Sequence, residues 1–214
     1  MPSVGELGVL AVVGVVVGVW GLWAGRGQAP VLSCVLESKG LPGIEGKVVL
    51  VTGANAGIGY HIALAVASRG GRLVMACRDA NRGQAAREAI ARASGSNTIS
   101  LIGIDLSNMR RTAKFVENFR NIFDQVDVII NNAATGLGAG VRGREETVEG
   151  LERVMATNHL GPHLLTTSLL PILATNGTVV TISSDSNLQA GNLDDLNSEG
   201  EYLPHTIYAR SPLI

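Results

Sequence analysis

Three glycines with a fixed spacing carry the clearest chemistry in the sequence. Gly53, Gly57 and Gly59 follow a β-branched apolar run, residues 47–51, and lead directly into a segment compatible with a helix, residues 60–69. Glycines at such a turn permit a tight bend, close approach of the backbone to a pyrophosphate, and close packing of helix on strand. The free N–H groups of the helix N-terminus would then hold the anion. The pattern predicts a phosphate-binding turn, although a hairpin or a packing turn would also use glycines.

The spacing of these glycines narrows the kind of nucleotide site. It is Gly-x-x-x-Gly-x-Gly, which differs from the common dinucleotide fingerprint, and it lacks the Lys-Ser/Thr pair that ends a nucleotide-triphosphate loop. With Thr52 in front, the turn resembles that of the short-chain dehydrogenase/reductase family. Further family features follow in the expected order: Asp105-Leu106, Asn131-Asn132-Ala133-Ala134, Asn158, Ser183-Ser184 and Tyr208. The chain is therefore identified as a member of that family from Lys47 to Tyr208.

The resemblance implies hydride transfer between a nicotinamide cofactor and an alcohol or carbonyl carbon. It implies that Tyr208 is the catalytic acid/base and that Asn158 holds a water in the proton relay. It also implies that Ser184, which fits the family pattern better than Ser183, orients the substrate oxygen. The cofactor contacts that it implies are Gly53, Asn55, Gly57, Ile58, Gly59, Asp105, Leu106, Asn132 and Ala133. In the last of these motifs, Ala134 replaces the glycine of the family pattern.

One position departs from the family pattern in a way that bears on catalysis. The family places a lysine four residues after the catalytic tyrosine, on the same face of the helix, and this sequence has Pro212 there. A free tyrosine has a pKa of about 10 and needs a nearby cation to act as a base at neutral pH. Proline supplies no cation, and Arg210 lies on the opposite side of a helix from Tyr208. Losing such a partner typically costs about 10²–10⁴ in rate, so we expect little catalysis.

Two segments indicate the branch of the family and hence the substrate. The segment 187–196, which widens the gap between Ser184 and Tyr208, and the segment 76–79 resemble the retinol dehydrogenase branch. Relatives that act on other lipophilic alcohols share these features. The predicted substrate is therefore a lipophilic alcohol or carbonyl such as retinol or retinal.

The residues after the predicted strand 72–77 bear on the choice of cofactor. An acid there usually binds the ribose 2′-hydroxyl of NAD, whereas an arginine favours the 2′-phosphate of NADP. Arg78 holds this position, with Asp79 next to it. A guanidinium matches phosphate bidentately, so the sequence predicts NADP(H). A solvated loop charge is the alternative interpretation of Arg78.

The elements that must position these residues alternate between short apolar strands and helical segments. This alternation predicts an α/β fold with a Rossmann-like, doubly wound parallel sheet over residues 44–214. A net charge of −1 gives no electrostatic basis for binding nucleic acid. Cys34 and Cys77 predict no disulfide framework, and His159 and His163 lack the further ligands of a metal site. Family members are often dimeric, so a homodimer is a further implication of the resemblance.

The N-terminal region has a different composition. After residues 1–6, an uncharged apolar run covers 7–24 and ends with two tryptophans, which predicts one transmembrane helix followed by a linker, 25–43. A cleaved signal peptide and a core helix are the alternatives. Basic residues follow the run and none precede it, which places the catalytic domain on the cytosolic side. The predicted location is the endoplasmic reticulum membrane.

The C-terminal region suggests a second class of function. Family members continue beyond Tyr208 with further strands, so we expect a chain truncated after the fifth strand. The predicted strand 177–182 would then form an apolar sheet edge, which is a predicted aggregation site. The alternative to an active oxidoreductase is therefore a non-catalytic truncated form that binds cofactor weakly or binds a protein partner.

Overall fold

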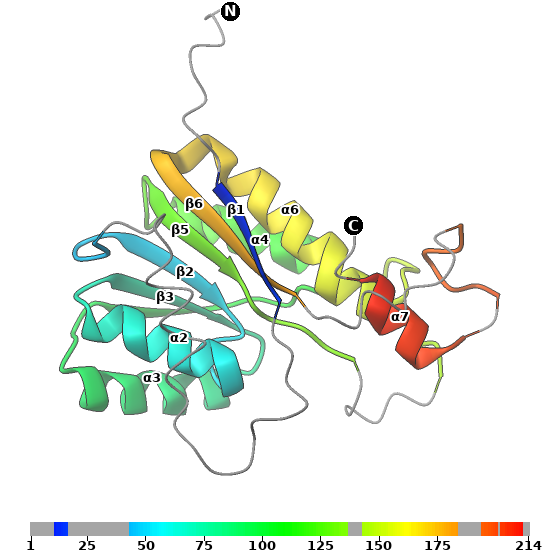
Figure 1. Cartoon of the computed structure of the whole chain (residues 1–214), viewed down its shortest axis with the longest axis horizontal. Coiled ribbons are helices and arrows are strands. Elements are labelled where there is room, and N and C mark those ends of the chain that lie inside the picture. Colours follow the sequence, from blue (N-terminus) through cyan, green and yellow to red (C-terminus); the bar gives the residue numbers. More distant parts are fainter. Residues whose placement is uncertain (1–10, 17–42, 137–142, 184–193, 201, 212–214) are drawn as a thin grey trace, which may run out of the picture.

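The computed structural model describes residues 11–16, 43–136, 143–183, 194–200 and 202–211, and for residues 11–16 it describes the backbone alone. These residues form one parallel β-sheet with helices on both faces (Figure 1). The strands are β1 Ala11–Val16, β2 Val48–Thr52, β3 Arg72–Cys77, β4 Ile99–Gly103, β5 Val126–Asn131 and β6 Leu173–Ser183. The main helices are α2 Gly57–Ser68, α3 Ala80–Ser94, α4 Met109–Arg120, α6 Gly161–Leu169 and α7 Pro204–Arg210.

The strand order across the sheet is β1-β6-β5-β2-β3-β4, and every neighbouring pair is parallel. From β2 at the centre, the chain runs outward through β3 and β4 and then returns to the other side of β2 with β5 and β6. This reversal makes the carboxyl ends of β2 and β5 a topological switch point, where doubly wound sheets bind their ligands. The predicted Rossmann-like sheet is confirmed in this respect.

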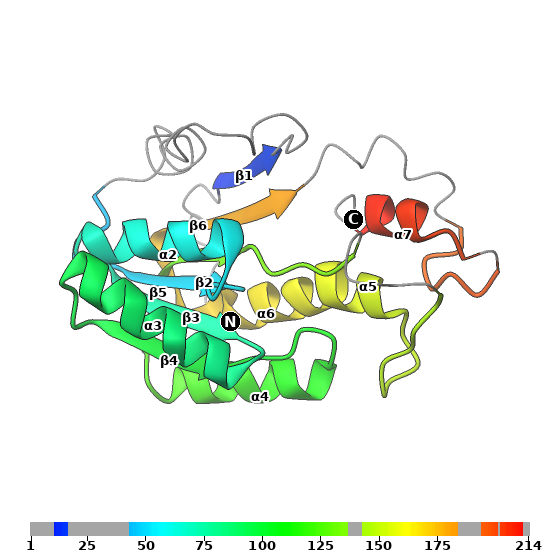
Figure 2. The same cartoon turned by 90° about the horizontal axis from the view of Figure 1, so that it is seen from below.

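Two apolar layers pack against the two faces of the sheet. On one face, Val49 and Val51 of β2 pack with α2 and α3, while Leu50 of the same strand packs on the other face with α4 and α6. Figure 2 shows the helices on either side of the sheet. Alternate residues of a strand point to opposite faces, so a strand covered on both sides must be apolar throughout. All five residues of β2 are buried accordingly.

The N-terminal run is the main difference from the sequence prediction. A transmembrane helix is predicted over 7–24, but Ala11–Val16 forms strand β1, paired in parallel with Thr178–Ser183 of β6. The segment is rich in valine, whose β-branched side chain favours strands, and β6 offers a row of backbone groups for pairing. The prediction that strand 177–182 forms an open sheet edge is wrong, because β1 pairs with residues 178–183 of β6. Residues 7–10 and 17–24 lie outside the described residues.

Within the part of the chain that the structure describes, no helix has both the length and the apolar character needed to cross a membrane.

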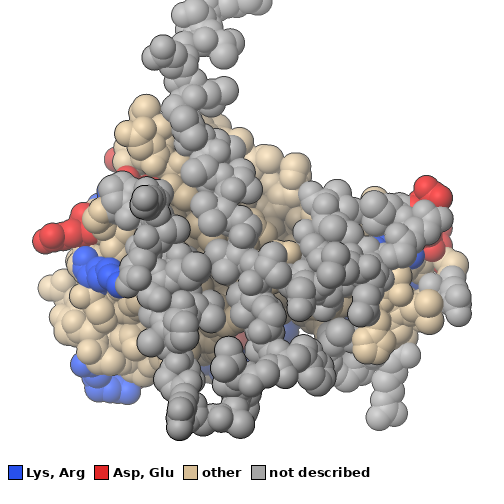
Figure 3. Space-filling model, in the orientation of Figure 1, with Lys and Arg blue, Asp and Glu red and all other residues tan. Residues whose placement is uncertain are grey.

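Figure 3 shows acidic and basic side chains near one another at both ends of the face that it presents.

The helical segment that carries Asn158 is interrupted. It consists of a short α-helix α5 (Arg153–Met155), a π-helical turn η1 (Ala156–Leu160), α6, and a 3-10 turn η2 (Leu170–Ile172). Residues before α5 are not helical because Gly150 has a φ of 77° and because Glu146 and Glu152 form an antiparallel bridge. The π-helical turn is notable because such turns are frequent at functional sites.

Candidate functional site

A cavity of about 360 Å³ lies at the carboxyl ends of the central strands. Its lining residues come from the turn after β2, the ends of β3 and β4, and the segment after β5. They are Gly53, Asn55, Ala56, Ala76, Arg78, Asp79, Arg82, Ile104, Asp105, Leu106, Asn132, Ala133, Ala134, Thr135 and Thr157. Seven of the predicted cofactor residues are among them: Gly53, Asn55, Arg78, Asp105, Leu106, Asn132 and Ala133. Gly57, Ile58 and Gly59 lie beside the cavity, in the first turn of α2.

The glycine turn is built so tightly that two of its positions exclude a side chain. A Cβ on Gly59 would overlap the carbonyl oxygen of Gly53 and the side-chain amide of Asn132. Gly53 has a φ of 67°, and a Cβ there would lie 2.9 Å from Cα of Ala133. These close approaches bring the end of β2, the start of α2 and the end of β5 together. The structural reason for glycine at both positions is the one predicted.

The N-terminus of α2 provides donors for an anion. Its N-cap residue, Ala56, has no side chain that can accept a hydrogen bond from the first turn. The first-turn N–H groups therefore have no side-chain cap, and their partial positive charge favours a negatively charged ligand. A pyrophosphate fits such a donor set, so the residues present fit a dinucleotide.

Thr52 joins the two central strands through its hydroxyl group. This buried oxygen accepts hydrogen bonds from the backbone N–H groups of Asn132, at 2.9 Å, and Ala133, at 3.0 Å. The side-chain amide of Asn132 in turn donates to the Thr52 carbonyl oxygen at 2.9 Å. Sequence reasoning used Thr52 only as part of the turn motif and missed this role. A hydroxyl residue at the end of an otherwise apolar strand is the signal that could have indicated it.

Asp105 and Leu106 form the wall of the cavity at the end of β4. The hydroxyl of Ser107 donates to the Asp105 carboxylate at 2.6 Å, and the Arg111 guanidinium lies 3.6 Å from the other carboxylate oxygen. Leu106 is buried, and a Cβ on Gly161 would overlap its carbonyl oxygen. Ser107 and Arg111 thus hold the Asp105 carboxylate in place.

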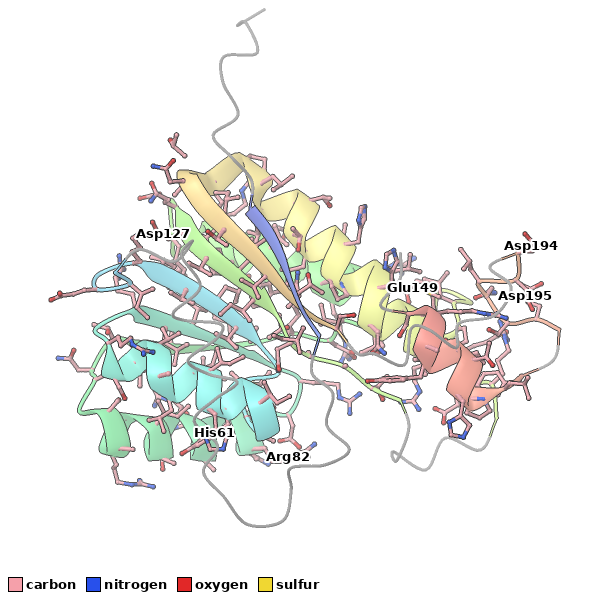
Figure 4. All side chains as sticks on the ribbon, in the orientation of Figure 1. His61, Arg82, Asp127, Glu149, Asp194 and Asp195 are labelled. Carbon is pink, nitrogen blue, oxygen red and sulfur yellow. The ribbon has the colours of Figure 1, made fainter. Side chains whose placement is uncertain are left out.

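The loop after β3 and the first turn of α3 bring three charged side chains to the cavity. The sequence predicts Arg78 there with Asp79 beside it, whereas the third, Arg82, was missed. Asp79 is the N-cap of α3, and hydrogen bonds from the backbone N–H and the guanidinium of Arg82 lower the pKa of its carboxyl. Figure 4 shows Arg82 near the N-terminal end of α3, at the opposite end of the sheet from Asp127. An exposed arginine on a helix gives no sequence signal that separates it from an ordinary surface charge.

Cys77 lies under the glycine turn but offers no reactive thiolate. It is buried, and burial raises the pKa of its thiol to about 11, although backbone N–H groups of Ala54 and Asn55 act in the opposite direction. The thiol is therefore protonated at neutral pH. Its role is that of a small apolar residue.

Asn158, the predicted water-holding residue, lies in the π-helical turn η1 and is tied to two other segments. Its side-chain oxygen accepts from the Thr135 N–H at 2.8 Å, and its side-chain NH₂ donates to the Thr135 carbonyl at 2.8 Å. The same NH₂ group donates to the hydroxyl of Ser211 at 2.9 Å. Thr135 and Thr157 reach the cavity wall, so this group of residues borders the cofactor cavity.

Tyr208 lies on α7, whose last residues pack near Asn158. Gly136 has a φ of 153°, and a Cβ on it would overlap the Tyr208 ring, so the ring lies directly on the backbone at this position. Ser211 donates to the Tyr208 carbonyl oxygen at 2.9 Å. Ser183 ends β6, whereas Ser184 and Pro212 lie outside the described residues. The relation of Ser184 to Tyr208 therefore stays a prediction.

His159 and His163 lie next to Asn158 along the helix and stack with ring centroids 6.1 Å apart. Burial lowers the pKa of His159, and the nearby His163 lowers it further. Among the described residues, no three His, Cys, Asp or Glu side chains form a group that could hold a metal ion.

Comparison with known proteins gives consistent matches. The model of a family described as short chain dehydrogenase matches residues 47–193. Dehydrogenase/reductase SDR family member 12 of Homo sapiens is 45% identical over 159 residues, which cover 73% of this chain and 49% of that protein. Retinol dehydrogenase 12 of Homo sapiens is 36% identical over 174 residues, which cover 79% of this chain and 54% of that protein. The chain thus spans about half the length of these relatives.

Among solved structures, a putative uncharacterized protein from Mycobacterium paratuberculosis superposes with a TM-score of 0.69 at 33% identity. The superposition covers 80% of this chain and 59% of the other.

Proposed function

The chain belongs to the short-chain dehydrogenase family, in its retinol dehydrogenase-like part, and we propose that it binds NADP(H) and transfers a hydride between this cofactor and a lipophilic alcohol or carbonyl. The observation that carries the proposal is the cavity at the switch point. It gathers the glycine turn, the Asp105 wall and Asn132 around one space. The bound nicotinamide would supply or accept the hydride, so the protein must bind, orient and manage one proton.

The choice of NADP(H) over NAD(H) rests on charge at the end of β3. Arg78 is exposed, lines the cavity, and has an extended cationic side chain that can pair bidentately with a phosphate. The neighbouring carboxylate of Asp79 is already engaged by Arg82. The Arg78→Ala variant is therefore expected to lose affinity for NADPH far more than for NADH, and equal losses would exclude this role.

The proton step is proposed for Tyr208, with Asn158 and Ser184 as the partners that the sequence predicts. Asn158 is fixed by its two hydrogen bonds to Thr135, which position its NH₂ group next to the cavity wall. The Tyr208 ring is oriented by its contact with Gly136. Because Pro212 stands in the sequence where the family pattern has the lysine that assists the tyrosine, we expect slow turnover.

The substrate class is proposed from the relatives. A human retinol dehydrogenase is among them, which supports retinol or retinal as a first substrate to test. A homodimer is also part of the proposal, and sedimentation velocity tests it.

Membrane association is a separate part of the proposal and rests on the apolar run 7–24. The location that we propose is the endoplasmic reticulum, with the catalytic domain on the cytosolic side. Ala11–Val16 pairs with β6, so association at this segment would compete with strand pairing. Cosedimentation with phosphatidylcholine vesicles tests it: protein that stays in the supernatant would exclude association.

The experiment that tests the main proposal combines binding and turnover. The purified full chain is titrated with NADPH and with NADH by calorimetry, and NADPH oxidation is then followed with retinal present. We expect selective binding of NADPH and slow oxidation that requires retinal and that is lost in Tyr208→Phe. Failure to bind either cofactor would overturn the proposed function. Binding without any turnover would limit the function to cofactor binding.

A further inference from the structure

We propose that Arg82 is a positioning residue for cofactor choice: it holds and neutralises the Asp79 carboxylate, so that a 2′-phosphate is accepted at the end of β3. The inference rests on the proposed function, because it concerns the same cavity. It goes beyond the assignment of Arg78, because it also gives Asp79 and Arg82 defined roles in the selection between NADP(H) and NAD(H).

Both oxygens of the Asp79 carboxylate are occupied by one residue. Oδ1 accepts a hydrogen bond from the backbone N–H of Arg82 at 2.9 Å, and Oδ2 accepts one from its Nε at 2.9 Å. The first bond caps helix α3. The second forms an ion pair between two residues that both line the cavity. Each oxygen of the carboxylate is therefore bound to the first turn of α3, and Arg82 competes with a ribose hydroxyl for this acceptor.

This arrangement matters because an acid near the end of this strand normally favours NAD. A carboxylate there accepts a hydrogen bond from the ribose 2′-hydroxyl and repels a 2′-phosphate. Asp79 would act in this way if it were free. Its pairing with the Arg82 guanidinium occupies part of its acceptor capacity and offsets its negative charge, so that the positive charge of Arg78 can act on the phosphate.

The pair is too exposed to be needed for folding. The side chains of Arg82 and Asp79 are 68% and 39% exposed. Exposed ion pairs contribute little to stability, because water and salt screen them. Substitution of Arg82 should therefore change ligand selection without unfolding the domain.

The test compares four proteins by calorimetric titration with NADPH and NADH at low salt: the unchanged chain, Arg82→Gln, Arg82→Gln with Asp79→Asn, and Arg92→Gln. Glutamine retains the backbone N–H that caps α3, and asparagine caps helices as well as aspartate does. Arg92 lies in the last turn of the same helix, is exposed, and does not line the cavity, so its substitution controls for the loss of one positive charge.

We expect Arg82→Gln to lower the selectivity for NADPH over NADH by about 10-fold, with the effect shrinking as salt rises. The double variant should recover most of this selectivity, because the uncompensated carboxylate is gone. Arg92→Gln should resemble the unchanged chain.

Three results would overturn the inference. Unchanged selectivity in Arg82→Gln would exclude any part for this residue. Equal weakening of both cofactors would indicate a general loss of the site. Selectivity that falls in Arg82→Gln and stays low in the double variant would exclude action through Asp79. An unchanged chain that binds neither cofactor would instead overturn the proposed function and the inference with it.

Discussion

The cofactor half of the domain, residues 48–132, and its catalytic half, residues 135–211, are held together by different kinds of contact. In the cofactor half, Asn132 donates two hydrogen bonds to Thr52, which lies 80 positions away in the sequence, at the meeting point of two central strands. In the catalytic half, Asn158 reaches Thr135 and Ser211, which lie in a segment after β5 and at the end of the seven-residue helix α7. The pairing of strands β2 and β5 brings Thr52 and Asn132 together, whereas Asn158, Thr135 and Ser211 are held together by side-chain hydrogen bonds.

This difference separates the structural basis of cofactor binding, in the first half, from that of turnover, which needs both halves. Parallel strands bring their carboxyl ends to one edge, so a binding turn forms wherever the core forms. The catalytic residues are brought together by short elements, since Asn158 lies in a five-residue π-helical turn and Tyr208 in a seven-residue helix. Binding should therefore tolerate changes in the catalytic half, and turnover should be sensitive to changes in either half.

The largest change is expected from Pro212→Lys, which restores a cation four residues after Tyr208 in the sequence. The lysine would supply the positive charge that the family pattern pairs with the tyrosine, and we expect retinal reduction with NADPH to rise by about 10²–10⁴. Pro212→Gln is the matched control, because it removes the proline without adding charge. A rate that rises equally in both variants would show that backbone geometry, and not charge, limits the catalytic half.

Gly59→Val should abolish cofactor binding. The new side chain would overlap the Gly53 carbonyl and the Asn132 amide, which forces the turn open. Because of this opening, we expect affinity for NADPH to fall by about 100-fold or more. Overpacking at such a site also costs about 1–3 kcal/mol of folding stability. Gly103→Ala is the control, because none of the described residues comes within 4 Å of a Cβ there. Retained binding in Gly59→Val would mean that the turn does not hold the pyrophosphate.

The thiol of Cys77 reports on how tightly the cofactor half is closed. Burial raises its pKa from 9.0 to about 11, so the thiolate fraction at pH 8 is about 100-fold lower than for a free thiol. In a Cys34→Ser background, iodoacetamide should label the native chain at least about 100-fold more slowly than the urea-unfolded chain. Because the folded pKa lies above the unfolded one, the stability due to this neutral thiol is lost as pH rises from 9 toward 11. Equal labelling rates would mean that the turn over Cys77 opens readily.

Thr52→Val tests the hydrogen bonds that join β2 to β5. Valine matches threonine in shape but leaves the N–H groups of Asn132 and Ala133 without their acceptor. We expect a loss of about 2–3 kcal/mol in the free energy of unfolding, measured by urea denaturation. Thr52→Ser keeps the hydroxyl and should lose about 1 kcal/mol, mainly for the methyl group. A smaller loss for valine than for serine would contradict the role of the hydroxyl.

The same contrast accounts for what the sequence predicts well. Gly53 and Gly59 can be recognised because a strand–helix junction needs glycine mainly where the backbone bends sharply or approaches another group closely. The hydrogen bonds of Thr52 cannot be recognised in this way, because their partners become neighbours only when the sheet forms. Arg82 was missed since an exposed arginine on a helix resembles any surface charge.

The N-terminal run was misassigned over Ala11–Val16 for a different reason. A valine-rich apolar segment fits both a helix in lipid and a strand on a sheet edge, and its hydropathy alone does not separate them. The deciding factor is the unpaired edge of β6, which no local pattern reveals. Prediction was thus strongest where one residue's own geometry decides the structure, and weakest where a distant partner does.

The smallest effect is expected from Ser211→Ala, which probes the catalytic half directly. The Ser211 hydroxyl accepts from Asn158 and donates to the Tyr208 carbonyl, so its loss removes one link between α7 and η1. We expect a cost of about 1 kcal/mol, faster hydrogen exchange in α7, and unchanged affinity for NADPH. Ser94→Ala is the matched control, since Ser94 donates to the Ile90 carbonyl within α3 and should leave exchange in α7 unaltered. If Ser211→Ala weakened NADPH binding as much as it loosened α7, the two halves would be energetically coupled, and the contrast between them would fail.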